Sequence, residues 1–109
     1  MDSNLKKAII DTEGDLLYTT CIEECAELIQ ALSKIKRDLY FHKDMNVNHL
    51  NNVIEEIGDV KLNIELIEEQ LIRDFPSFIE DKDKIKNYYR LVKLNKLNNI
   101  FLKKENDNE

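Results

Sequence analysis

The chain has 109 residues, a formal net charge of −6 and 42% hydrophobic residues. This length suits one domain, and a sequence pI near 5.0 argues against nucleic-acid binding as the main function. No segment approaches the roughly 18 apolar residues of a membrane span, and the first residues lack the apolar stretch of a secretory signal. We therefore expect one domain over residues 1–109, in the cytoplasm, without nucleic acid or membrane as a partner.

The first half of the chain reads as two helices. Two glycines and one proline leave little turn chemistry for a sheet, and the apolar residues recur with helical spacing. The pattern predicts a short helix over about Ser3–Thr12 with Ser3 as N-cap, then a break at Gly14. A long helix over about Asp15–Phe41 follows, and the polar segment His42–Asn48 is expected to be a loop.

The second half reads as two more helices. A third helix is predicted over about His49–Asp74, because Pro76 disfavours helix in the residue before it. A fourth is predicted from Ser77 or Phe78 to about Leu102, followed by a frayed tail over Lys103–Glu109. The expected fold class is all-α, a four-helix-type bundle in which the two long antiparallel helices carry the acidic motifs described next.

Two short acidic motifs stand out within the apolar helical pattern. They are Glu24-Cys25-Ala26-Glu27 and Glu56-Ile57-Gly58-Asp59, and one more glutamate precedes each. A spacing of three residues places both carboxylates on one side of a helix, and in both helices this pair lies at the same edge of the apolar stripe. Crowded carboxylates at a core edge repel each other unless a cation compensates them. We expect Glu24, Glu27, Glu56 and Asp59 to bind a hard divalent ion, Mg²⁺ or Mn²⁺.

This E-x-x-E and E-x-x-D arrangement resembles the MazG-like branch of the all-α nucleoside triphosphate pyrophosphohydrolases. The stretches that carry the resemblance are EECAELIQALSK (Glu23–Lys34) and EEIGDVKLNIELIEEQL (Glu55–Leu71). The resemblance implies hydrolysis of a ribo- or deoxynucleoside triphosphate at the α-phosphorus, giving the monophosphate and pyrophosphate.

Leu62 and Leu66 lie away from the main apolar stripe of their helix, which favours a homo-oligomer, a dimer or tetramer.

Further residues fit a role in this reaction. The catalytic residues expected are Glu23, Glu24, Glu27, Glu56 and Asp59. Among them Glu23 and Glu27 are the better-placed candidates to orient or deprotonate the attacking water, although the sequence does not separate ligand from base. The residues expected to bind substrate are Lys34, Arg37 and Asn63.

Each of these assignments has an alternative. Lys34 is otherwise a solvated lysine near a helix end, and Asn63 a residue of a helix–helix contact. His42 and His49 match no ligand spacing and are interpreted as loop or cap residues. The whole chain could instead be a non-catalytic helical module for nucleotide sensing or protein association, which its composition fits equally well. The repeated geometry of the two acidic motifs favours the enzyme.

Overall fold

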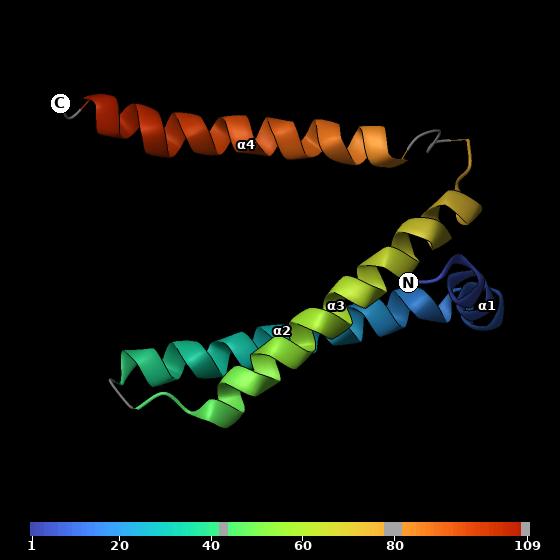
Figure 1. The fold of residues 1–109 in the computed structure, drawn as a ribbon, viewed down its shortest axis with the longest axis horizontal. Coiled ribbons are helices and arrows are strands. Elements are labelled where there is room, and N and C mark those ends of the chain that lie inside the picture. The colour runs from blue at the N-terminus through green and yellow to red at the C-terminus, as the bar shows by residue number, and fades with distance from the viewer. Residues whose placement is uncertain (42–43, 78–81, 108–109) are drawn as a thin grey trace. The chain divides into compact units, whose positions relative to one another are not determined.

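A computed structural model of the chain describes residues 1–41, 44–77 and 82–107. These residues form four α-helices and no strand, as Figure 1 shows: α1 (Ser3–Glu13), α2 (Leu16–Tyr40), α3 (Val47–Asp74) and α4 (Lys82–Asp107). The all-α class predicted from the apolar spacing is therefore confirmed. In none of the described helices does a stretch combine the length and apolar character needed to cross a bilayer.

The chain divides into two compact units, Met1–Asp74 and Phe75–Glu109. The first unit contains α1, α2 and α3, and the second contains α4. The packing of four helices into one bundle and the single domain over residues 1–109 stay predictions.

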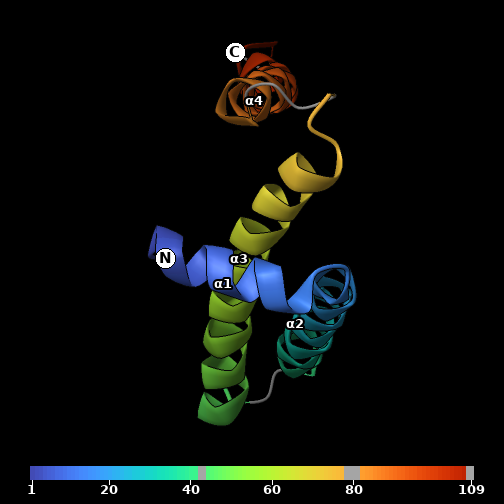
Figure 2. The same ribbon diagram turned by 90° about the vertical axis from the view of Figure 1, so that its right-hand side faces the viewer.

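Helices α2 and α3 form an antiparallel hairpin, and α1 lies across its open end, where α2 begins and α3 ends (Figure 2). Burial explains this arrangement, because Ile10, Leu17 and Leu66 bring one apolar side chain from each helix into a common cluster. Each is at most 4% exposed. Ion pairs support the crossing, since Arg73 of α3 pairs with Asp11 of α1. The open end of the hairpin is thereby fixed by both apolar and charged contacts.

The starts of α1 and α3 differ from the sequence prediction by a residue or two, and side-chain caps explain why. The N-cap of α1 is Asp2, not Ser3, because Asp2 Oδ1 accepts the backbone N–H groups of Asn4 and Leu5 at 2.6 and 3.3 Å. Likewise α3 begins before His49. Asn46 Oδ1 accepts the N–H groups of Asn48 and His49 at 2.9 and 3.3 Å, which caps the first turn.

Two predictions about the second unit need correction, and part of one lies outside the described residues. Ser77 does not begin a helix, because Pro76 and Ser77 form a turn, and the alternative start at Phe78 lies among residues 78–81, which are not described. Helix α4 extends beyond its predicted end near Leu102 to Asp107, and the fraying predicted over Lys103–Glu109 stays a prediction. No proline or glycine follows Leu102, and Lys and Glu favour helix, so nothing in the sequence ends the helix there.

Candidate functional site

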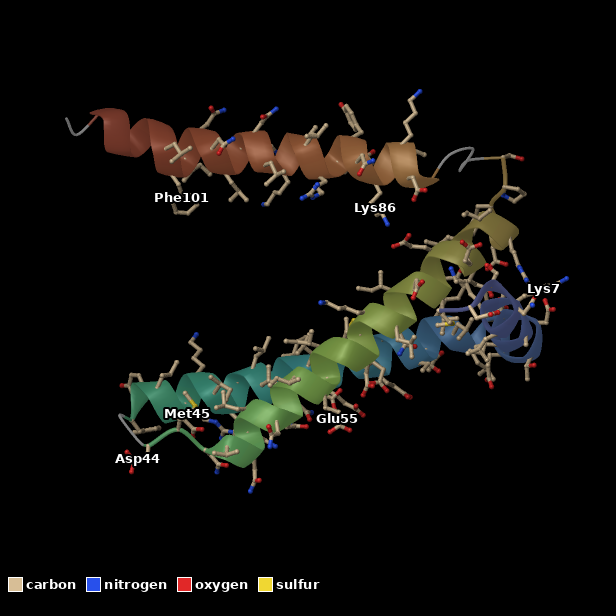
Figure 3. All side chains as sticks on the ribbon, in the orientation of Figure 1. Lys7, Asp44, Met45, Glu55, Lys86 and Phe101 are labelled. Atoms are coloured by element: carbon tan, nitrogen blue, oxygen red, sulfur yellow. The ribbon has the colours of Figure 1, made fainter. Side chains whose placement is uncertain are left out.

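The two acidic motifs meet on facing helices of the hairpin. One carboxylate oxygen from each of Glu24, Glu27 and Glu56 lies within 4.8 Å of the other two. Glu24 and Glu27 belong to α2, whereas Glu56 belongs to α3, so the antiparallel pairing is what brings them together. Figure 3 shows oxygen-bearing side chains gathered along the hairpin near the labelled Glu55. We call Glu24, Glu27 and Glu56 the acidic cluster.

The acidic cluster brings carboxyl groups close together, and none of the three is in an ion pair with another described residue. Glu24 and Glu56 are half-buried, and the Oε2 atom of each is shielded from water without a hydrogen-bond partner. Loss of hydration, followed by the charges of Glu27 and Glu24, raises the pKa of the Glu56 carboxyl to about 7. The pKa of Glu24 is also raised, first by loss of hydration and then by the charges of Glu27 and Asp59.

These features fit a hard cation. No lysine or arginine among the described residues forms an ion pair with the acidic cluster. In an octahedral Mg²⁺ site the ligand oxygens lie about 3 to 4 Å apart, so oxygens within 4.8 Å of one another need only a small contraction. Glu27 is exposed, which leaves one side of the cluster open to water and to a ligand.

The remaining acidic residues of the motifs lie beside this cluster. Asp59 is outside the group of three, but its charge contributes to the raised pKa values of Glu24 and Glu56. Glu23 is exposed and also outside the group. Asn63 is buried, and its Nδ2 donates to the backbone oxygen of Asp59 at 2.8 Å. That bond attaches Asn63 to the turn of α3 that carries Asp59.

The two basic residues expected to bind substrate share a pocket near the closed end of the hairpin. Its volume is about 320 Å³, and we call it the basic pocket. The residues that line it are Lys34, Arg37, Asp38, Phe41 and His49. Figure 3 marks the same end of the hairpin by Asp44 and Met45.

Sequence reasoning missed the pair formed by Asp38 and His49. His49 Nδ1 lies 2.6 Å from Asp38 Oδ2, which joins the end of α2 to the first turn of α3. His49, interpreted from the sequence as a loop or cap residue, lies in the first turn of α3, whereas His42 lies outside the described residues. One signal was available. His49 precedes Glu56 by seven residues and therefore lies on the same side of α3.

The chain was also compared with known proteins. No family model, no curated protein and no solved structure matches it.

Proposed function

We propose that this protein is a Mg²⁺-dependent nucleoside triphosphate pyrophosphohydrolase of the MazG-like type. The observation that carries the proposal is the convergence of Glu24, Glu27 and Glu56, with two shielded oxygens that lack a partner. Such a group is costly to assemble unless it binds a cation, and oxygen-only ligand sets suit Mg²⁺ or Mn²⁺.

Glu24, Glu27 and Glu56 would hold the metal, with Asp59 as a fourth carboxylate nearby. When bound, the ion supplies positive charge that neutralises the substrate phosphates and offsets the charge that develops during hydrolysis. The half-buried Glu24 and Glu56 are suited to a fixed ligand role, because their shielded oxygens have few other partners. Asp59 lies close enough to affect their charge without belonging to the group of three.

Orienting and deprotonating the attacking water falls to the more accessible carboxylates. Glu27 combines membership of the acidic cluster with exposure to solvent, so water reaches it directly. Glu23 is exposed at the preceding turn and is the second candidate. A carboxylate in either position would accept a proton from water aligned with the α-phosphorus.

The substrate would be bound by cationic groups near the closed end of the hairpin. Lys34 and Arg37 line the basic pocket and are proposed to contact phosphate oxygens. Asn63 is only 8% exposed and bonds to Asp59 O, so its proposed role is to support the position of Asp59. This agrees with the alternative of Asn63 as a packing residue.

A homo-oligomer is part of the proposal. Large apolar side chains are exposed along both hairpin helices. They include Ile22, Ile29, Leu32, Ile54, Leu62 and Ile64. Leu62 is 46% exposed, whereas Leu66 is buried in the α1 cluster, so Leu62 is the residue of that pair available for a second subunit. Sedimentation at micromolar concentration tests this directly, and a monomer would contradict it.

The function is tested by a pyrophosphate-release assay with Mg²⁺ across ribo- and deoxynucleoside triphosphates, with chromatographic identification of the products. We expect monophosphate and pyrophosphate, and loss of both in EDTA. Glu56→Gln should abolish turnover, whereas Glu55→Gln, which removes the same charge from an exposed neighbour outside the cluster, should retain it. Mg²⁺-dependent nucleotide binding without turnover would indicate a sensor. Neither binding nor turnover would indicate an association module.

A further inference from the structure

The basic pocket contains a charge arrangement that the acidic cluster does not explain. It lies between the last turns of α2 and the first turn of α3, and Phe41 adds an aromatic side chain to its wall. The Asp38 side chain is only 13% exposed and that of His49 30%, with 2.6 Å between Asp38 Oδ2 and His49 Nδ1. The carboxylate of Asp38 is therefore already engaged within the protein.

Two cations of the same pocket are not paired with a described carboxylate. Neither Lys34 nor Arg37 forms an ion pair with another residue that the structure describes. With Asp38 held by His49, the pocket presents two cationic side chains and one imidazole toward a shared space. Side chains of this kind bind phosphate oxygens through charge-assisted hydrogen bonds.

The contact with Asp38 also determines which ring nitrogen of His49 faces a ligand. An ionised carboxylate only accepts, so Nδ1 donates to ionised Asp38, and Nε2 is left as the second hydrogen-bonding atom of the ring, which donates to an anion when the ring carries both protons. The imidazole is held in one orientation by this bond. A ring fixed in this way loses less conformational freedom when it binds a ligand than a mobile one.

The basic pocket and the acidic cluster lie on matching sides of both helices. Lys34 follows Glu27 by seven residues on α2, and His49 precedes Glu56 by seven residues on α3. Seven residues are close to two full turns, so each pair shares a side of its helix and is separated by about 10 Å along the axis. Because α2 and α3 are antiparallel, both offsets point toward the closed end of the hairpin.

We infer that the basic pocket binds the terminal phosphates of a polyphosphate anion, with the Asp38–His49 pair as a positioning element beside Lys34 and Arg37. The identification of that anion with the β- and γ-phosphates of a nucleotide rests on the function proposed above. Binding of the anion itself does not rest on that function, because none of the acidic cluster residues lines the basic pocket.

The test is titration calorimetry of inorganic pyrophosphate into the 109-residue chain in EDTA, so that no divalent ion links the anion to the acidic cluster. We expect saturable binding that Lys34→Met or Arg37→Gln weakens by about tenfold or more, the usual effect of losing one charged hydrogen bond. Lys36→Met is the matched control. It removes the same charge from an exposed residue that does not line the pocket, and it should alter the affinity less than twofold.

His49→Gln tests the positioning element. It should weaken pyrophosphate binding about tenfold while circular dichroism shows unchanged helical content. Equal losses in Lys34→Met and Lys36→Met would overturn the inference, because they would indicate binding to diffuse charge. So would the absence of binding at millimolar pyrophosphate, or binding of an uncharged nucleoside in its place.

A second titration separates this inference from the proposed function. With Mg²⁺ and a non-hydrolysable α,β-methylene triphosphate, both Glu56→Gln and Lys34→Met should reduce affinity. Of these two variants, only Lys34→Met should reduce the affinity for pyrophosphate in EDTA. If the protein has no turnover and yet retains this pocket-dependent pyrophosphate binding, the inference holds and the proposed reaction fails. If turnover is intact but pyrophosphate binding is insensitive to Lys34, the inference fails alone.

Discussion

Binding of Mg²⁺ to the acidic cluster should release protons, and Glu56 determines how many. Its carboxyl has a pKa of about 7, raised by loss of hydration and by the neighbouring glutamates. A ligand carboxylate must be ionised, so the ion displaces whatever proton Glu56 carries. From that pKa, Mg²⁺ should release about 0.9 proton near pH 6, about 0.5 near pH 7 and about 0.1 near pH 8. Glu24 should increase the number of protons released at the lower pH values, because its pKa is also raised.

The assay is calorimetric titration of Mg²⁺ into the metal-free protein in buffers that differ in ionisation enthalpy. The slope of the observed enthalpy against the buffer enthalpy gives the number of protons released. Glu56→Gln should lose most of this release, whereas Glu55→Gln should keep it, because Glu55 is exposed and lies outside the acidic cluster. A proton count near zero at pH 6 and pH 7 in the wild-type chain would refute the reasoning. So would identical slopes for the two variants.

The same shift has a consequence for stability without metal. A carboxyl whose pKa is higher in the folded chain than in the unfolded chain binds extra protons in the folded state between those two values. Its contribution is therefore fully present below about pH 4.5 and is lost as the pH rises through about 7. We expect the melting temperature of the metal-free protein to fall over this window relative to that of Glu56→Gln. Mg²⁺ should restore it at pH 8 by binding the folded state.

Three further predictions concern the scaffold. Gly58→Ala should raise the free energy of unfolding by about 1 kcal/mol, because a Cβ there meets no described atom within 4 Å. Gly14→Ala should lower the free energy of unfolding by about 1 to 3 kcal/mol, because Gly14 has φ +54°, and denaturant titration of both variants checks the opposite signs. Leu66→Ala should cost about 2 to 5 kcal/mol in the same titration, since the side chain is 4% exposed in the α1 cluster, and a change below 1 kcal/mol would contradict that packing. The Tyr18 hydroxyl donates to Asp74 at 2.7 Å and lowers the pKa of Asp74, so this contribution to stability is present above about pH 4 and lost as the pH falls further. Tyr18→Phe should reduce the change in melting temperature between pH 2 and 5, and an unchanged acid sensitivity would contradict the assignment.

The helical class and the acidic edges could be predicted because both depend on local spacing. A three-residue separation places Glu24 and Glu27 on one side of α2 wherever that helix packs, and the same holds for Glu56 and Asp59 on α3. Gly14 likewise signalled the break between the first two helices, where its positive φ is now observed. Short-range rules are less reliable at helix ends, where the side chains of Asp2 and Asn46 accept the first N–H groups of α1 and α3.

The contacts between helices could not be predicted from residue spacing in the same way. The sequence placed four carboxylates at matching edges, but only the packing of α2 on α3 brings Glu56 to Glu24 and Glu27 and leaves Asp59 outside the group of three. Similarly, nothing in the spacing of Asp38 and His49 shows that the turn between helices places them 2.6 Å apart. The sequence by itself determined which side chains share a helix face, because that follows from the helical repeat. The tertiary structure alone decided which faces meet and which carboxyls lose water, because register and desolvation arise only when the helices pack.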